Sequence, residues 1–171
     1  MLDYAKPIRF DYGPADVNAL CRAAAAAASA EQTAPAVRLF EDQQAGEIVT
    51  DAERLRLVLI NVLTNAREAA LPAAPAGPDV QLRTDCPSAD TVRITVTDRG
   101  HGILPEHLAR IFDPFFTTKR TGSGLGLAIA KNIVEGLGGT IAIASEPSRG
   151  TTVRITLPRE APRDRRQAGE A

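Results

Sequence analysis

The sequence has little cysteine, little histidine and no long apolar run, and each shortage excludes a class of protein. Two cysteines, Cys21 and Cys86, among 171 residues are too few and too isolated for a disulfide framework or a zinc site. With only two histidines, His101 and His107, any metal site must rely on oxygen ligands. No apolar run approaches the roughly 20 residues of a membrane span, and no charged-then-apolar signal pattern opens the chain. We therefore expect a reducing, cytoplasmic setting without membrane contact.

Charge and composition narrow the classes further. A net charge of −1 lacks the excess of positive charge that is typical of nucleic-acid-binding domains. The hydrophobic content of 44% and the charged content of 24% are close to globular averages, and 171 residues are enough for one domain with a real core. The chain is therefore expected to be one globular domain that does not bind nucleic acid.

A glycine-rich loop is the most informative stretch. Residues 113–126 pass from a polar loop into an apolar helical run, with Gly122, Gly124 and Gly126 on alternate positions. Glycines let the backbone approach a bulky ligand, and the following helix would aim its free N–H groups at the loop. Lys119 adds a positive charge, so phosphate is the expected guest. The Gly-Lys-Ser/Thr triplet of a Walker loop is absent and Leu127 replaces the third glycine of a dinucleotide fingerprint, which leaves a plain surface loop as the alternative.

A helix is expected over residues 50–70. Thr50, with Glu53 three residues later, predicts a capping box at its start. Four apolar residues repeat at helical spacing and predict the buried stripe. They are Leu55, Leu59, Val62 and Ala66.

A second stripe of the same helix is polar. Asn61, Asn65 and Glu68 stand at i, i+4 and i+7 and share one face. Asparagine is a poor helix former, so two of them one turn apart need a reason. Either they cap backbone groups or face solvent, or the amide oxygen of Asn65 binds a divalent cation such as Mg²⁺, which takes further ligands from phosphates.

A carboxylate follows the strand expected over residues 91–97. Asp98 is followed by Gly100, His101 and Gly102, a pattern that suits a pocket where the aspartate meets the polar edge of a flat ring. An ordinary turn is the alternative, because Asp and Gly also form turns. His107 is interpreted as a surface residue.

Alternation and helical spacing predict the remaining elements. Asp16 is expected to cap a helix that runs to about Ala30. The helix after the glycine loop should turn Ile129, Ile133 and Val134 inward and end at Gly138. Strands are expected over residues 36–41, 46–49, 79–85, 140–145 and 151–157, and helices over residues 105–111 and 125–137.

Together, these motifs resemble the ATP-binding catalytic domain of sensor histidine kinases, in the superfamily shared with gyrase, HSP90 chaperones and MutL. The similarity covers residues 16–157, and Phe-Phe-Thr-Thr-Lys is most similar to the nitrogen-regulation type. Four segments match the N box, the first glycine box, the F box and the second glycine box of the family. They are residues 61–66, 98–102, 111–116 and 122–127.

The resemblance implies a fold, a ligand and roles for residues. The fold would be α+β, a Bergerat-type α/β sandwich whose mixed, mostly antiparallel sheet packs under three helices, with a flexible ATP lid over residues 117–123. Asn65 would hold Mg²⁺, Asn61 and Lys119 would act at the phosphates, and Asp98 would accept a hydrogen bond from the adenine amino group. The implied ATP-binding residues are Asn61, Asn65, Asp98, Gly100, Gly102, Ile103, Phe112, Lys119, Gly122, Ser123, Gly124, Leu125, Gly126 and Thr151.

Two departures refine the expected function. Hydrolytic relatives carry a glutamate base where Asn61 stands, and an amide cannot take a proton at neutral pH, so transfer to a side chain is favoured over hydrolysis. Neither histidine has the acceptor setting His-Glu/Asp-x-x-Asn/Thr-Pro. The chain is therefore interpreted as the catalytic part of a protein histidine kinase, which binds Mg-ATP but cannot phosphorylate itself.

The same interpretation predicts a division of the chain and its partners. Residues 1–14 would be the remnant of the acceptor hairpin plus a linker, residues 15–158 the ATP-binding catalytic domain, and residues 159–171 a disordered tail. The expected partners are a separate hairpin domain that carries the acceptor histidine and, indirectly, a response regulator. The piece itself is expected to be a monomer and its parent a dimer, with membrane anchoring of the parent left open.

Two other functions stay open at this stage. A serine/threonine kinase of the anti-sigma type would share the fold and would label a partner's serine in an acid-stable form. A nucleotide-sensing module would bind Mg-ATP without transferring phosphate to any supplied hairpin domain.

Overall fold

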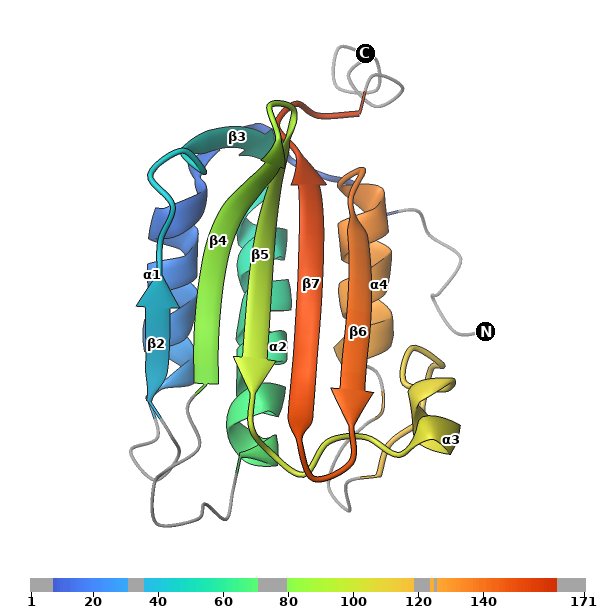
Figure 1. Cartoon of the computed structure of the whole chain (residues 1–171). Coiled ribbons are helices and arrows are strands. Elements are labelled where there is room, and N and C mark those ends of the chain that lie inside the picture. The colour runs from blue at the N-terminus through green and yellow to red at the C-terminus, as the bar shows by residue number, and fades with distance from the viewer. Residues whose placement is uncertain (1–7, 31–35, 71–79, 119–123, 125, 163–171) are drawn as a thin grey trace.

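The computed structural model describes residues 8–30, 36–70, 80–118, 124 and 126–162. Its main layer is a five-stranded sheet in the order β2-β4-β5-β7-β6, in which β2 and β4 are parallel and all other neighbours antiparallel (Figure 1). The sheet is therefore mixed and mostly antiparallel, as the sequence predicts. Its strands are β2 (Val37–Phe40), β4 (Val80–Ser88), β5 (Thr91–Asp98), β7 (Gly150–Pro158) and β6 (Thr140–Glu146).

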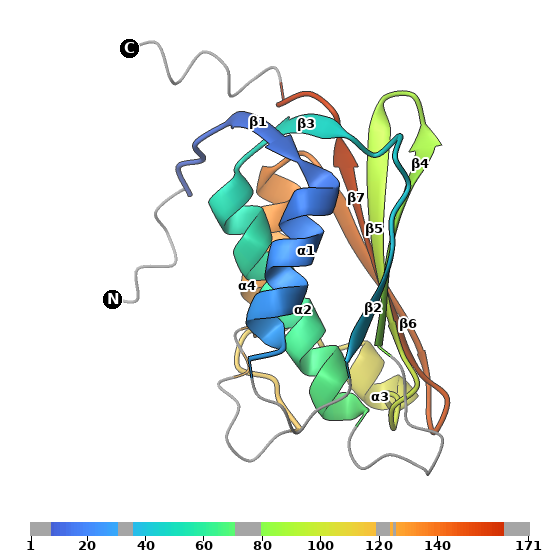
Figure 2. The same cartoon turned by 90° about the vertical axis from the view of Figure 1, so that its left-hand side faces the viewer.

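Three long helices cover one face of this sheet (Figure 2). They are α1 (Val17–Ala28), α2 (Ala52–Ala69) and α4 (Gly126–Gly136), while the single turn of α3 (Pro105–Leu108) lies at the end of the sheet where β5 finishes. A small second sheet, in which β1 (Gly13–Asp16) pairs antiparallel with β3 (Glu47–Thr50), lies at the opposite end. Among the described helices none has the length and apolarity needed to cross a bilayer.

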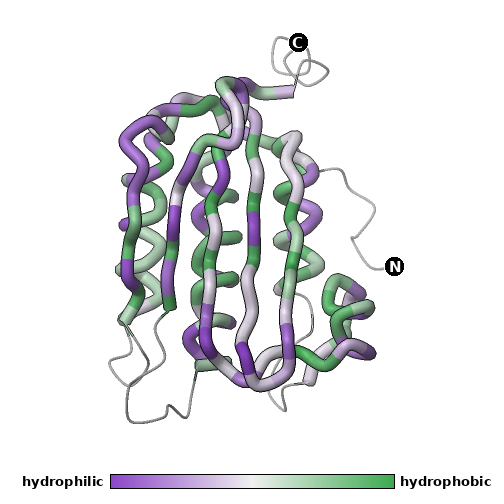
Figure 3. Tube along the Cα trace, viewed as in Figure 1, coloured by the Kyte–Doolittle hydropathy of each residue, from purple (hydrophilic) through white to green (hydrophobic). Residues whose placement is uncertain are grey.

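The core lies between the helices and the sheet. The predicted stripe of α2 is buried, and it faces the inward residues of the central strands, which alternate with polar ones along each strand (Figure 3). Burying one such aliphatic side chain contributes roughly 1.5–3 kcal/mol, so the hydrophobic pattern accounts for the sandwich. The largest fully buried side chains of the core are Ile48, Leu55, Leu59, Leu63, Leu82, Ile94, Ile155 and Leu157.

The helix starts show one correct prediction and one wrong one. Asp16 caps α1 as expected, because its carboxylate accepts the backbone N–H of Ala19 at 2.7 Å. The expected capping box at Thr50 is wrong: Thr50 lies in β3, and the adjacent Asp51 caps α2 by accepting the N–H of Arg54 at 3.1 Å. A carboxylate is the stronger acceptor, and β3 holds the Thr50 backbone in its pairing with β1.

The phase of α4 differs from the prediction at one residue. Ile133 and Val134 face the core, but Ile129 is 49% exposed, because the inward stripe passes through Ala130. Gly138 ends the helix as predicted: it has φ +83°, and the next N–H, that of Gly139, donates to the Val134 carbonyl at 2.9 Å.

Ordered structure extends past both expected boundaries of the domain. Ile8, Phe10 and Tyr12 pack against the core, and the Tyr12 hydroxyl donates to the Gly136 carbonyl at 2.9 Å. After β7, the Arg159 guanidinium donates to backbone carbonyls of the turns before β3 and β5. Residues 8–12 and 159–162 therefore belong to the folded unit, whereas residues 1–7 and 163–171 lie outside the described part of the chain.

Candidate functional site

A cavity of about 590 Å³ opens where the carboxyl ends of α2 and β5 meet the start of α4. It brings together the polar face of α2, the segment after β5, and the two ends of the glycine-rich loop, which the sequence predicts as parts of one site. The described polar residues in its lining are Asn61, Asn65, Glu68, Asp98, His101, His107, Thr117, Thr118 and Thr151, and apolar residues such as Val96, Ile143 and Val153 complete it.

Asp98 is the buried charge of this cavity. Only 5% of its surface is exposed, and one carboxylate oxygen accepts the N–H of Gly100 at 2.8 Å. Burial raises the pKa of the Asp98 carboxyl above its ordinary value, while backbone hydrogen bonds from Gly100 and Thr151 and the nearby His101 offset part of that effect. A buried carboxylate at the cavity wall is a strong acceptor for a ligand N–H group.

Two glycines after Asp98 fit because they have no side chain. A Cβ on Gly100 would lie 2.2 Å from the Ala69 carbonyl oxygen at the end of α2, and one on Gly102, which has φ +71°, would lie 2.0 Å from the Glu146 carbonyl oxygen. The segment is thus wedged between α2 and the β6–β7 turn, which fixes the depth of the cavity at this end.

The two asparagines of α2 lie at the other end of the cavity. The Asn65 amide nitrogen donates to the Asn61 amide oxygen at 3.2 Å, so the pair is oriented by its own hydrogen bond. A Cβ on Gly126, the first residue of α4, would lie 2.6 Å from the Asn61 amide nitrogen. The backbone at the start of α4 therefore packs directly on Asn61, next to the N–H groups that favour an anion.

The oxygen atoms that line the cavity suit a Mg²⁺ ion that takes some of its ligands from the protein and the others from a bound phosphate group. In the described chain, no three His, Cys, Asp or Glu side chains form a metal cluster. The cavity offers the amide oxygen of Asn65 and, one turn further, the Glu68 carboxylate. Mg²⁺ accepts such oxygen ligands, keeps several waters and completes its shell with phosphate oxygens, so these residues fit a magnesium-phosphate ligand better than an ion bound by the protein alone.

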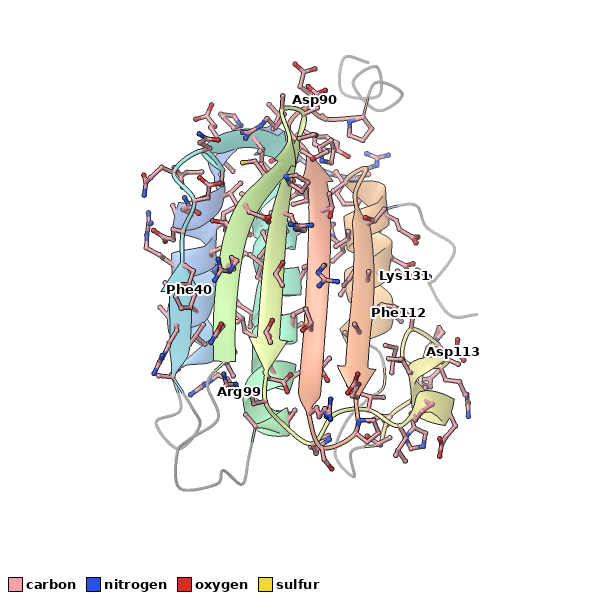
Figure 4. All side chains as sticks on the ribbon, viewed as in Figure 1. Phe40, Asp90, Arg99, Phe112, Asp113 and Lys131 are labelled. Atoms are coloured by element: carbon pink, nitrogen blue, oxygen red, sulfur yellow. The ribbon has the colours of Figure 1, made fainter. Side chains whose placement is uncertain are left out.

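The expected ATP-binding residues either line the cavity, lie away from its lining, or lie outside the described residues. Gly100 lies behind the wall, where it donates to Asp98, and the expected residues Lys119, Gly122, Ser123 and Leu125 lie outside the described residues. The structure places Phe112 outside the cavity lining, where its ring lies 5.1 Å from the Lys131 ammonium (Figure 4). Those that line the cavity are Asn61, Asn65, Asp98, Gly102, Ile103, Gly124, Gly126 and Thr151.

Two aromatic rings of the lining were not predicted. His107, expected at the surface, lines the cavity with its ring 5.6 Å from that of Phe116, which also lines it. Ile111 follows His107 by four residues and lines the cavity too, so this spacing was the signal available in the sequence. Phe115, with φ +67°, donates its N–H to the Gly124 carbonyl at 3.0 Å, which joins the two ends of the loop.

Comparison with known proteins defines the class. The family described as histidine kinase-, DNA gyrase B- and HSP90-like ATPases matches residues 50–161, and the chain belongs to this family. Among curated proteins, it is 36% identical over 160 residues to the sensor histidine kinase ZraS of Escherichia coli K12, covering 92% of this chain and 33% of ZraS. It is 38% identical over 117 residues to the histidine-protein kinase AtoS of the same strain, covering 68% of this chain and 19% of AtoS.

Solved structures agree with this assignment. The fold matches a structure of the mycobacterial sensor histidine kinase MprB with a TM-score of 0.75 and 26% identity, over 89% of this chain and all of that one. It matches full-length ShkA, solved in complex with AMPPNP, with a TM-score of 0.78 and 27% identity, over 92% of this chain and 33% of ShkA. The fold predicted from the motifs, that of a histidine kinase catalytic domain, is thereby confirmed. The chain spans about one third of the length of the ZraS sequences it matches.

Proposed function

We propose that this domain binds Mg-ATP in the cavity and transfers the γ-phosphoryl group to a histidine on a separate phosphoacceptor domain. One observation carries the proposal: the same cavity holds a buried carboxylate, Asp98, at one end and the Asn61–Asn65 pair beneath Gly126 at the other. The first suits the amino edge of adenine and the second a magnesium-bound phosphate chain. The volume lies within the roughly 300–1,000 Å³ of ordinary ligand pockets.

Each end has a defined task in phosphoryl transfer. Asp98 would accept the adenine amino hydrogen, and Thr151 would lie beside it. The backbone of Gly124 and Gly126, with Lys119, would hold the phosphates, and the amide of Asn65 would hold Mg²⁺, which neutralises charge on the phosphate oxygens. Such transfer depends mainly on positioning and charge neutralisation, which these groups supply.

The acceptor is a nitrogen nucleophile rather than water. Asn61, which has no basic group, occupies the position next to Gly126 where a hydrolytic enzyme needs a base. Glu68 lines the cavity but follows Asn61 by seven residues, about 10 Å along the axis. In the proposed step an imidazole nitrogen forms a bond to the γ-phosphorus, the bond to the bridging oxygen breaks, ADP leaves, and the imidazole proton passes to solvent.

Several finer statements belong to the same proposal. The resemblance to sensor histidine kinases supports a hairpin domain as the phosphoacceptor and a response regulator as the next recipient. We also propose that this chain is monomeric on its own and that its parent kinase is a dimer, since the hairpin is the part expected to dimerise. Sizing with light scattering tests this, and a dimer mass for the isolated chain would contradict it.

The decisive experiment combines binding and label transfer. Titration calorimetry with ADP and Mg²⁺ should give saturable binding that Asn65→Ala abolishes, whereas Asn132→Ala, on an exposed face of α4, should leave it unchanged. Incubation of the isolated chain with γ-labelled ATP should give neither protein-bound label nor free phosphate. Addition of a cognate hairpin domain should give acid-labile label on that domain.

The other outcomes separate the alternatives. Acid-stable label on a partner serine would identify a serine/threonine kinase. Binding without any transfer to the hairpin would identify a nucleotide-sensing module. Steady phosphate release would show an ATPase and would overturn the role given to Asn61.

A further inference from the structure

The hydroxyl of Ser145, in β6, joins three segments directly behind the cavity wall. It accepts the backbone N–H of Ile103 at 2.8 Å and donates to the Gly150 carbonyl at 3.0 Å. Its oxygen also lies 2.8 Å from the hydroxyl oxygen of Thr151, which lines the cavity. Ser145 itself is not among the described lining residues. It is therefore placed to act on a ligand only through its neighbours.

The hydrogen-bond inventory of a serine selects one direction for the contact with Thr151 that satisfies every group around it. A hydroxyl has one proton and two acceptor lone pairs. All three contacts are hydrogen bonds at once only when the single Ser145 proton is used on Gly150 and one lone pair by Ile103, so that the remaining lone pair accepts from Thr151. In that arrangement the Thr151 proton points toward Ser145, and Thr151 presents its oxygen to a ligand as an acceptor.

This acceptor stands beside a second one. Thr151 is the cross-strand partner of Asp98 in the β5–β7 pair, and both side chains line the cavity. The buried Asp98 carboxylate is itself an acceptor. Two adjacent acceptors suit an exocyclic amino group, whose two hydrogens can reach one acceptor each, and oppose an oxo group at the same position, because lone pairs facing one another in a desolvated site repel.

We propose that Ser145 is a positioning residue that holds the Thr151 hydroxyl in its acceptor orientation and so favours 6-aminopurine over 6-oxopurine nucleotides. The inference rests on the proposed function, in which this cavity binds a purine nucleotide. Its new content is that part of the base selectivity comes from a side chain outside the cavity. Without Ser145, the Thr151 proton is free to turn toward the ligand and to donate to an oxo group.

The test compares dissociation constants for ADP and IDP, which differ at position 6 of the purine and at the adjacent ring nitrogen. Titrations use the full chain with Mg²⁺. Ser145→Ala should reduce the preference for ADP by about threefold to tenfold, the worth of one neutral hydrogen bond. Ser88→Ala is the matched control, since it removes a hydroxyl pair of the same length, 2.8 Å to Thr91, at the other end of the sheet. That variant should keep the wild-type preference.

Two further variants show whether the effect passes through Thr151. In a Thr151→Val background, Ser145→Ala should no longer change the ADP/IDP ratio, because no hydroxyl remains to be turned. In the wild-type background, Ser145→Thr keeps a hydroxyl at this position and should therefore keep the wild-type ratio of ADP to IDP dissociation constants. Should Ser145→Ala not fold, Thr151→Val alone decides: it should weaken ADP more than IDP if the Thr151 oxygen accepts from the 6-amino group, and the reverse would overturn the inference.

The failures are distinguishable. Equal loss of ADP and IDP affinity in Ser145→Ala would mean that Ser145 only braces the Ile103 backbone, and a change in ratio that persists in the Thr151→Val background would exclude the route through Thr151. Either result overturns this inference while leaving nucleotide binding intact. A wild-type chain that binds neither nucleotide would overturn the proposed function as well.

Discussion

Asp98 combines burial with the proposed role of hydrogen-bond acceptor for the ligand, so we expect its titration to affect binding. Its pKa is raised, chiefly because burial disfavours the carboxylate. In the ligand-free protein the carboxylate costs stability above that pKa, and the cost is relieved as pH falls through it, because the folded state takes up the proton first. A ligand amino group instead needs the ionised acceptor.

We therefore predict that ADP affinity decreases on acidification from a higher pH than an ordinary aspartate would give. Asp98→Asn should bind ADP about 10-fold to 100-fold more weakly at neutral pH, the cost of losing a charge-assisted hydrogen bond, and should lack this pH dependence. Calorimetric titrations of both proteins across the acidic range measure the effect. Because the protonation of ADP is common to both, parallel pH profiles would contradict the role of Asp98.

For single residues, the sequence correctly predicted which side chains lie in the cavity where a regular helix or strand positions them. Asn61 and Asn65 share a helical face, and Asp98 ends a strand, so periodicity was sufficient to bring them together. Periodicity could not show that Phe116 lines the cavity and Phe112 does not. They flank a turn in which Phe115 adopts φ +67°, and no sequence period reports which ring a left-handed residue directs toward the cavity.

The element scale is best tested at the start of α2, where the sequence and the structure disagree. Asp51 accepts the N–H of Arg54 with one carboxylate oxygen and that of Asp11, at 2.9 Å, with the other. The Thr50 hydroxyl is buried and has no hydrogen-bond partner among the described residues. The two positions therefore make opposite contributions to stability.

We predict that Asp51→Ala lowers the free energy of unfolding by about 1–3 kcal/mol, through the loss of a helix cap and of the bond to Asp11. Thr50→Val, which replaces a buried unpaired hydroxyl by a methyl, should be neutral or stabilising by up to about 1 kcal/mol. Urea unfolding followed by circular dichroism measures both. A capping box at Thr50 would require the reverse order, with Thr50→Val the more harmful change.

The reason for the wrong prediction lies in competition between neighbours. Thr50 and Glu53 satisfy the capping-box pattern, but Asp51 is also a cap former, and the sequence does not state where β3 ends. The same limit applies to α4, where Ile129 belongs to a helical run but lies one residue from the buried stripe at Ala130. Patterns predict that an element exists more reliably than they predict its phase or its first residue.

For the whole molecule, Arg159 is the residue that ties the end of β7 to the rest of the fold. Its guanidinium donates to the carbonyls of Gln44, Ala45 and Ala89 at 2.7–3.0 Å. Its backbone also bonds with Val49 in β3. These contacts lie at the end of the sheet opposite the Asp98 cavity.

Arg159→Ala should therefore lower the free energy of unfolding by about 1–3 kcal/mol, since it leaves backbone carbonyls without their charged donor. Nucleotide affinity should not change. Arg154→Ala is the matched control, because Arg154 is an exposed arginine of β7, five residues before Arg159. Thermal unfolding with and without ADP measures both the stability and the nucleotide affinity of each variant. An equal loss of stability in Arg159→Ala and Arg154→Ala would contradict the stabilising role of the Arg159 contacts.

The strands of the five-stranded sheet and the three long helices were predictable because the strands alternate and the helices carry apolar stripes. The layer architecture was implied by the family resemblance, and β1 was not predicted. The extent of the unit was not predicted either. Ile8, Phe10 and Tyr12 stand two residues apart, which is strand-like spacing, but Pro7, Gly13 and Pro14 around them indicate a linker. We propose as the catalytic unit residues 15–158 together with the flanking residues 8–14 and 159–162 that pack on it.

The arrangement of these flanks has a mechanical consequence. Pro14 pairs with Val49, and the Val49 N–H donates to the Arg159 carbonyl at 2.8 Å, so the first and last described stretches adjoin the same short strand, β3. We expect tension applied between residues 8 and 162 to load β1, β3 and Arg159 before the strands that line the cavity. We infer that a domain built in this way can be loaded at these flanks while the cavity keeps its shape.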